Sequence, residues 1–128
     1  HIATETAKEI ESKGLKTVGL LGTKFTMERD FFKNKLAEQG ISTIIPDDED
    51  REFIHKTVAD ELGKGIFKPE TKARYLAIMD KLSEQGAEGV ILGCTEIPLL
   101  IKENDTSMPS FDTTLIHSKA AVKFALSS

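Results

Sequence analysis

Short apolar runs alternate with longer segments of helical periodicity along this chain. In the first segment, Ile2 and Ile10 lie on the same side of a helix, and Gly14 follows where a helix would end. The next run, Thr-Val-Gly-Leu-Leu at 17–21, is short and almost entirely apolar, which is typical of a strand buried on both faces. The pattern therefore predicts an opening helix followed by a buried strand.

Three further short runs have the same character and predict strands at 41–45, 89–93 and 109–112. Apolar side chains spaced three and four residues apart predict helices at 27–39, 47–62, 69–85, 99–101 and 113–126. Strands that alternate with helices indicate a mostly parallel sheet with helices on both faces, a Rossmann-like α/β fold. Such sheets bind ligands at the carboxyl ends of their strands, so the residues after each strand are the first candidates for a site.

The run 47–50 consists of four acidic residues, Asp-Asp-Glu-Asp. Acidic clusters bind metal ions, but carboxylates also cap the free N–H groups of a helix start and complement its dipole. Because Ile54, Val58 and Leu62 continue a helical spacing directly afterwards, the pattern favours a helix start.

Composition narrows the class of protein. A length of 128 residues suits one domain, and a net charge of −4 argues against nucleic acid as a partner. No apolar run approaches the ~18 residues of a membrane span. The single cysteine excludes an internal disulfide and a CxxC motif, so the simplest compartment is a reducing cytoplasm.

Common metal and nucleotide motifs are missing from the sequence. The histidines at 1, 55 and 117 have no ligand spacing with one another or with the cysteine, so we expect no metal site. There is no GxGxxG and no Walker sequence, so we expect no nucleotide cofactor.

Small polar residues follow three of the predicted strands, at 22–26, 93–96 and 112–114. Each of these stretches leads into a predicted helix, whose first N–H groups are unpaired and carry partial positive charge. The threonine hydroxyls there are suited to binding a carboxylate or a phosphate. Simple helix capping by each threonine is the alternative.

Cys94 is the strongest single candidate for a functional residue, because it lies between a predicted strand and a helix start. A helix start favours the thiolate over the thiol, whereas a buried cysteine is usually inert, and both interpretations stay open. Glu96 opposes thiolate formation if it lies close, or binds a substrate ammonium group. No Gly-x-Ser or Gly-x-Cys elbow supports an acyl-transfer nucleophile.

Several motifs, in order and spacing, resemble the aspartate/glutamate racemase family. The stretch Val-Ile-Leu-Gly-Cys-Thr-Glu-Ile-Pro-Leu-Leu at 90–100 resembles the family's second-cysteine motif. The stretch 18–23 with Thr26, the Lys-Pro-Glu step at 68–70 and Phe-Asp-Thr-Thr at 111–114 extend the resemblance over essentially the whole chain. The resemblance implies two doubly wound, pseudo-symmetric α/β domains with a cleft between them, no cofactor, and two opposed groups, usually cysteines, that act on either face of the substrate Cα.

Carried to this sequence, the resemblance makes Cys94 the second catalytic cysteine. It implies that five further residues contact or orient the substrate: Thr23, Thr26, Lys68, Thr95 and Glu96. Of these, Lys68 resembles the family lysine that meets the side-chain carboxylate of the substrate.

The sequence departs from the family at its first catalytic motif. Nothing resembles the N-terminal Cys-Asn-Thr motif, and there is no second cysteine. By the family's layout, we expect 1–15 to be the crossover helix and 16–105 to be the second α/β domain carrying Cys94. The segment 106–128 is expected to be a strand and helix that return to an absent first domain. Such a C-terminal part is expected to be inactive alone and to expose apolar surface or self-associate.

The resemblance favours a cofactor-independent racemase of aspartate or glutamate, with a small amino acid as substrate and a homodimer as the assembly. Two alternatives stay open: a non-catalytic domain that binds small acids, and a related two-cysteine isomerase or decarboxylase. A Cys-Asn-Thr motif upstream of these residues would favour the racemase over the binding domain.

Overall fold

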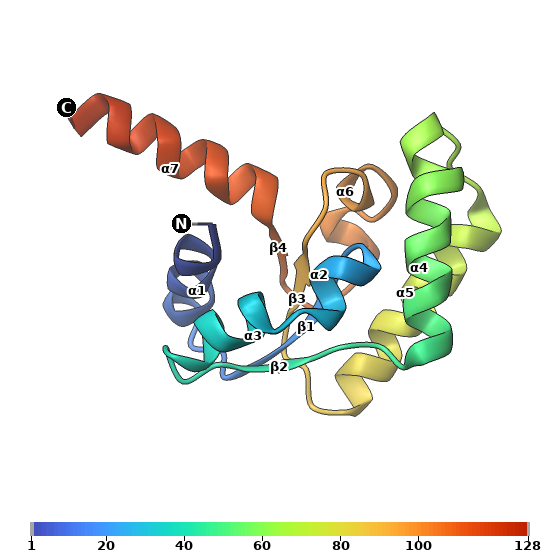
Figure 1. Cartoon of the computed structure of the whole chain (residues 1–128), viewed down its shortest axis with the longest axis horizontal. Coiled ribbons are helices and arrows are strands. Elements are labelled where there is room, and N and C mark those ends of the chain that lie inside the picture. Colours follow the sequence, from blue (N-terminus) through green and yellow to red (C-terminus); the bar gives the residue numbers. More distant parts are fainter. Residues whose placement is uncertain (1, 128) are drawn as a thin grey trace.

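The structure is a computed structural model that describes residues 2–127, and the side chains of residues 2–126. Its centre is a parallel sheet of four strands in the order β2-β1-β3-β4 (Figure 1). The strands are β1 (Thr17–Leu21), β2 (Ser42–Ile44), β3 (Val90–Leu92) and β4 (Ser110–Asp112). The predicted α/β fold with a parallel sheet is confirmed.

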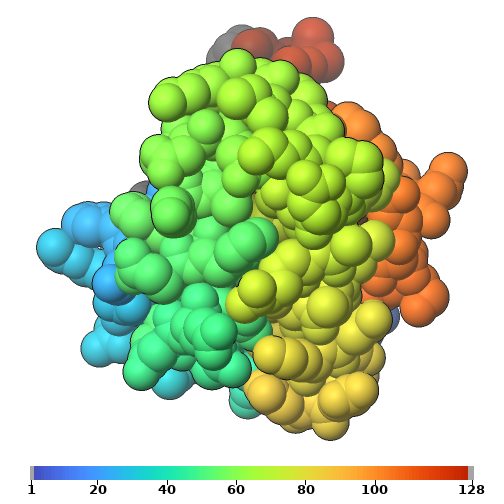
Figure 2. Space-filling model, turned by 90° about the vertical axis from the view of Figure 1, so that its right-hand side faces the viewer, coloured from blue at the N-terminus to red at the C-terminus, as the bar shows by residue number. Residues whose placement is uncertain are grey.

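Helices cover both faces of this sheet (Figure 1). One face is covered by α1 (Ile2–Ser12), α3 (Asp30–Ala37) and α7 (Thr113–Ser127). The other face is covered by α4 (Asp48–Asp60), α5 (Pro69–Glu84) and α6 (Ile97–Leu100). Figure 2 shows α4 and α5 lying side by side over this second face. The remaining helical segments are α2 (Lys24–Glu28), directly after β1, and the 3₁₀ turns η1 (Leu62–Lys64) and η2 (Glu103–Asp105).

Alternate residues of the strands point to opposite faces and build two separate apolar cores. Val18 and Leu20 of β1 pack with Ile10 of α1. Leu21, the next residue of β1, packs with Ile78 of α5 in the other core. Both faces of the sheet are therefore buried, as the nearly continuous apolar runs predict.

The predicted helix 27–39 is two helices in the structure. Arg29 has extended backbone angles (φ −80°, ψ 144°) and separates α2 from α3. Met27 packs into the core beneath α4 and α5, whereas Leu36 packs into the core beneath α1. A single straight helix would have to bury these two residues on opposite faces of the sheet, so the chain breaks between them.

The predicted helix 47–62 also differs at its end. Asp47 caps α4 by accepting a hydrogen bond from the backbone N–H of Asp50 at 2.9 Å, which confirms the helix start. The helix ends at Asp60, and Leu62 lies in η1 instead. Gly65 then adopts a left-handed conformation (φ 75°) that turns the chain toward α5.

The segment predicted to return to a first domain, 106–128, is joined to the rest of the sheet. Its strand β4 pairs in parallel with β3, with Leu92 opposite Asp112, so it forms one sheet with the strands of 16–105. From β4, helix α7 extends away from the body of the molecule beyond its contacts with α1 (Figure 1). The outer residues of the predicted terminal segments, His1 and Ser128, lie outside the described residues.

Candidate functional site

The turns that follow β1, β3 and β4 lie next to one another at the carboxyl edge of the sheet. β3 pairs with β1 on one side and with β4 on the other. The backbone N–H of Gly93 donates to the Leu21 carbonyl at 2.7 Å, and the Thr113 hydroxyl donates to the Leu92 carbonyl at 3.2 Å. The three polar turns predicted from the sequence therefore share one edge, and hydrogen bonds join their strand ends.

At Gly93, the turn after β3 closely approaches the end of β1 and the turn that follows it. A Cβ atom at this position would lie 2.8 Å from the Leu21 carbonyl oxygen and 3.2 Å from Cγ2 of Thr26. The carbonyl is backbone and cannot turn aside, so a larger residue would push the two turns apart. The absence of a side chain here brings the Cys94 turn against the turn that carries Thr26.

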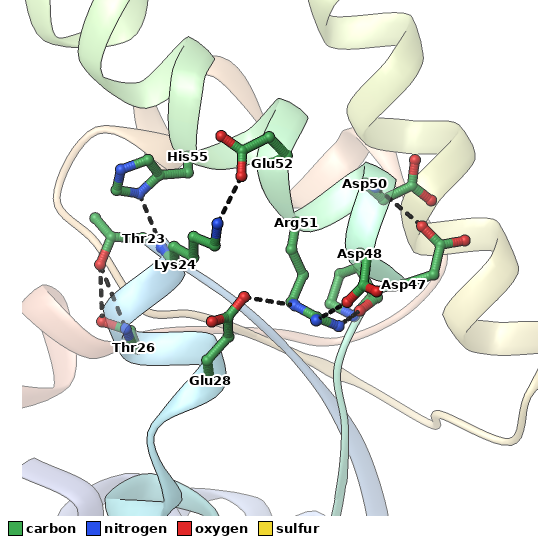
Figure 3. Close-up of polar contacts among 11 residues, drawn as sticks. Thr23, Lys24, Thr26, Glu28, Asp47, Asp48, Asp50, Arg51, Glu52 and His55 are labelled. Carbon is green, nitrogen blue, oxygen red and sulfur yellow. Dashed lines mark hydrogen bonds and ion pairs between the residues drawn. The ribbon is translucent and has the colours of Figure 1, made fainter.

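The Thr23–Thr26 turn forms the start of α2 (Figure 3). The Thr23 hydroxyl oxygen accepts a hydrogen bond from the backbone N–H of Thr26 at 3.4 Å, and the two hydroxyls lie 3.3 Å apart. Thr23 therefore caps α2. Helix capping was the alternative to ligand binding that the sequence left open for these threonines. Both residues are half-buried, and Thr26 lines a cavity.

A cavity of about 340 Å³ opens beside these turns. Its described lining residues are Ile2, Phe25, Thr26, Arg29, Phe31, Phe32, Gly93 and Thr113. Each of the three strand-end turns contributes to this lining, and three aromatic rings form much of the wall. The Arg29 guanidinium lies 4.0 Å from the centre of the Phe25 ring, a cation–π contact that orients the charge.

Sequence reasoning missed Arg29 and the aromatic wall. The spacing of Phe25 and Arg29, four residues apart, was the available signal, because it places two side chains on the same side of a helical turn. The break at Arg29 then directs these residues toward the cavity.

Cys94 is half-buried and packs against the core beneath α4 and α5. It does not belong to the described lining of the 340 Å³ cavity. Burial raises the pKa of the Cys94 thiol, and the nearby Glu96 carboxylate raises it further. Hydrogen bonds from the backbone N–H groups of Ile97 and Glu96 lower the pKa but do not offset these effects. The expected helix-start stabilisation of the thiolate is present and is outweighed.

The other predicted substrate residues fall into two groups. Thr95 is exposed and Glu96 is half-buried, and both follow Cys94 at the same edge. Lys68 is exposed at the N-terminal boundary of α5, in the connection from η1, and η1 contacts α6, the helix after the Cys94 turn. One turn further along, Lys72 forms an ion pair with Asp105 of η2 at 2.9 Å.

Two further properties concern the described part of the chain. Residues 2–127 contain no group of three or more His, Cys, Asp or Glu side chains arranged to hold a metal ion. None of the helices described is long and apolar enough to cross a membrane.

A sequence model of the Asp/Glu/hydantoin racemase family matches residues 1–121. The chain belongs to this family. An uncharacterized protein in the pnlA 3′ region of Pectobacterium carotovorum subsp. carotovorum is 27% identical over 104 residues, which cover 81% of this chain and 68% of that protein. Membership agrees with the resemblance found in the strand-end motifs.

Solved structures of similar proteins have the same fold. A candidate Asp/Glu racemase from Yersinia pestis shares 45% sequence identity, with a TM-score of 0.93 over 98% of this chain. An aspartate racemase homologue from Pyrococcus horikoshii OT3 shares 39% identity, with a TM-score of 0.91 over 97% of this chain. The chain spans only 55% and 54% of these two racemase-family proteins.

Proposed function

We propose that this family member contributes one half of the active site of an aspartate or glutamate racemase. The observation that carries the proposal is the joining of the Cys94 turn to the Thr23–Thr26 turn across β1 and β3, through the close approach at Gly93. Membership of the racemase family supports racemisation as the reaction.

In this proposal, the Cys94 thiolate removes the Cα proton from one face of the substrate and becomes a thiol. The electron pair left on Cα is delocalised into the substrate carboxylate. An acid on the opposite face then donates a proton to Cα and is left deprotonated. The reverse reaction exchanges the two roles, so no proton is gained or lost overall.

The opposing acid is not a cysteine of this sequence, which contains one cysteine. We propose that it belongs to the part of a racemase that this chain does not span, since the chain covers about half of its structural relatives. The 128-residue chain alone is then expected to lack racemase activity.

The raised pKa of Cys94 has a place in this chemistry. An amino-acid Cα–H is a very weak acid, so a thiolate of raised pKa is a better matched base than an ordinary one. The raised pKa also means that less of the Cys94 thiol is ionised at neutral pH. Nearby cations and hydrogen-bond donors must then stabilise the carbanionic state, with water excluded.

The proposed substrate contacts come from the turns and from the cavity. The hydroxyls of Thr23, Thr26 and Thr95 are proposed to bind the substrate carboxylate. The Glu96 carboxylate is proposed to bind the substrate ammonium group. Lys68 is proposed to meet the side-chain carboxylate, and Arg29 is a second candidate because its guanidinium lines the cavity. The proposal requires no cofactor and no metal.

The packing of this chain against a first domain is also a proposal. Helices α1 and α7 contact one another, and Val122 and Leu126 of α7 are largely exposed. We propose that this surface packs against a first domain, with the 1–15 helix as the crossover. A homodimer remains the proposed assembly.

A non-catalytic domain that binds small acids is the second candidate function. The position of Cys94 outside the described cavity lining favours it, because a carboxylate could then bind without the thiol. A two-cysteine isomerase or decarboxylase acting on another diacid would use the same site.

The deciding experiment follows deuterium uptake and optical rotation of each enantiomer of aspartate and glutamate in heavy water. A longer protein that contains these residues should racemise one of the two substrates, and the 128-residue chain should not. Cys94→Ala in the longer protein should lower the rate by about 10²–10⁴-fold, the usual contribution of one acid–base group. Thr106→Ala, a change outside the proposed site, serves as the control.

Unchanged racemisation by the Cys94→Ala variant would contradict the assignment of the base. Binding of the diacid without any exchange of the Cα proton would favour the binding domain instead. Rapid loss of optical activity with the 128-residue chain would contradict the need for a second half.

A further inference from the structure

Helix α4 contacts the short helix α2 through a row of polar side chains (Figure 3). The backbone N–H of Lys24 donates to Nδ1 of His55 at 3.0 Å. The Lys24 side chain pairs with Glu52 at 2.8 Å between Nζ and Oε2. At the other end of α2, Nε of Arg51 lies 3.1 Å from Oε2 of Glu28.

These contacts matter because α2 cannot hold its own conformation. It has five residues, far below the ~12 residues at which an isolated helix becomes even marginally stable in water. The same segment begins with the Thr23 cap and carries Thr26, which lines the cavity. The orientation of both hydroxyls therefore depends on what packs against α2.

The His55 contact differs in kind from the two ion pairs. Lys24 and Glu52 are both largely exposed, and exposed ion pairs of this kind contribute little. The His55 bond instead fixes a backbone N–H of the first turn of α2, a group with no partner inside the helix. It acts directly on the residue that follows Thr23.

We propose that His55 is a positioning residue for the Thr23–Thr26 turn. Its imidazole ring accepts the Lys24 N–H at Nδ1, which holds the residue after Thr23 against α4. Any effect on racemisation rests on the proposed function, since Thr23 and Thr26 are substrate contacts only within it. The positioning itself does not depend on that function.

Nuclear magnetic resonance of the ¹⁵N-labelled 128-residue chain tests the positioning directly. A ¹⁵N–¹⁵N coupling across the hydrogen bond is expected between the Lys24 amide and Nδ1 of His55. His55→Ala should shift the Lys24 and Thr26 amide signals and speed exchange of the Lys24 amide by roughly two- to tenfold, the effect of losing one ordinary hydrogen bond.

Two matched variants separate this role from a general effect on the helix. His55→Asn keeps an acceptor near the place of Nδ1 and should restore most of the Lys24 signal and its protection. Lys56→Ala changes the next exposed residue of α4 and should leave both unchanged. Absence of the coupling, together with unchanged Lys24 and Thr26 signals in His55→Ala, would overturn the proposal.

Kinetics of the longer, racemising protein provide the second readout. His55→Ala should raise KM about tenfold with a smaller fall in kcat, and His55→Asn should recover most of the loss. Equal KM values in all three proteins would overturn the link between His55 and substrate binding. If the wild-type protein does not racemise, the proposed function fails while the resonance result still decides the positioning.

Discussion

The Cys94 thiol has neighbours that act on its pKa in opposite directions. Burial favours the neutral thiol, and backbone N–H groups of the following turn favour the thiolate. The Glu96 carboxylate adds a like-charge repulsion to the thiolate and a hydrogen bond to the thiol. The net direction is upward, so the thiolate forms at a higher pH than in an unfolded chain.

Replacement of Glu96 by Gln should lower the pKa of Cys94, because it removes the carboxylate charge. Alkylation of the wild-type chain by iodoacetamide at neutral pH should be slower than alkylation of the same chain unfolded in urea. Glu96→Gln should speed the folded-state reaction by roughly two- to tenfold, since rate follows the thiolate fraction. The rate measured across pH gives the shift of the pKa.

The matched control is Glu103→Gln, which removes an exposed acid from η2. It should leave the alkylation rate unchanged. A wild-type rate at neutral pH above that of the unfolded chain would show that the helix start, not burial, controls this thiol.

At the residue scale, the positions of the polar turns could be predicted from the sequence, but the pKa of the thiol in one of them could not. The motif at 90–100 placed Cys94 after a strand, and the structure agrees. The pKa direction could not be predicted, because it depends on burial by residues of α4 and α5 far away in sequence. Arg29 was missed because its position results from a break in a helix that local spacing predicts to be continuous.

Helices α4 and α5 are joined by a buried carboxylate. Asp50 of α4 is 3% exposed, and its two oxygens bind Arg74 at 2.9 Å and Lys81 at 3.0 Å, both of α5. Burial raises the pKa of Asp50, but the hydrogen bonds and charges of Arg74 and Lys81 outweigh it, so the pKa is lowered. The ion pairs therefore persist below the pH at which an exposed aspartate is protonated.

Asp50→Asn should destabilise the fold by about 1–3 kcal/mol at pH 7, the usual cost of losing charged hydrogen bonds at a buried group. Arg74 and Lys81 remain partly exposed, which limits the cost. A carboxylate with a lowered pKa contributes stability above its unfolded pKa and loses it as pH falls through the folded pKa. The difference between wild type and variant should thus shrink on acidification below about pH 4.

Urea unfolding at a series of pH values measures this difference. Asp80→Asn, at an exposed position of α5, should change the free energy of unfolding by less than ~0.5 kcal/mol. A pH-independent loss in Asp50→Asn would mean that the side chain's packing, not its charge, joins the two helices.

At the element scale, periodicity predicted the helices and strands but not where helices are interrupted. The break at Arg29 and the end of α4 at Asp60 both follow from tertiary packing. Met27 and Leu36 are buried in different cores, and Leu62 is buried by a 3₁₀ turn next to α6. Local spacing contains no information about which core a residue enters.

At the scale of the whole molecule, α7 exposes apolar side chains. Val122 and Leu126 are 59% and 83% exposed, on a helix that extends past the body of the fold (Figure 1). Large apolar side chains exposed along one helix indicate a surface that binds another protein surface. In the proposed layout that surface is a first domain.

The 128-residue chain should therefore self-associate in a concentration-dependent way. Val122→Lys combined with Leu126→Lys should shift sedimentation velocity profiles toward the monomer, because two charges cannot be buried in an apolar contact. Ser118→Lys adds a charge to the same helix without removing apolar surface, and should have a smaller effect. Monomeric wild-type chain at all concentrations would contradict a binding role for this surface.

At this largest scale, the sequence predicted the α/β class from its own pattern, because alternating strands and helices leave few topologies. The division into two domains came only from the family resemblance, since no local feature of 1–15 or 106–128 specifies a partner. In the structure, the pairing of β4 with β3 joins the strand of 106–128 to the sheet formed by the strands of 16–105.

The strand order has a consequence for how the protein folds. Gly19 and Val90 are partners in the two central strands although about seventy residues separate them in sequence. Closing so long a loop loses chain entropy before any strand pairing compensates for it, so contacts between distant segments slow folding. The α4–α5 pair, built from neighbouring segments, can form before that closure. The Cys94 and Thr23–Thr26 turns meet only when β1 and β3 pair, so their meeting belongs to the late, slow part of folding.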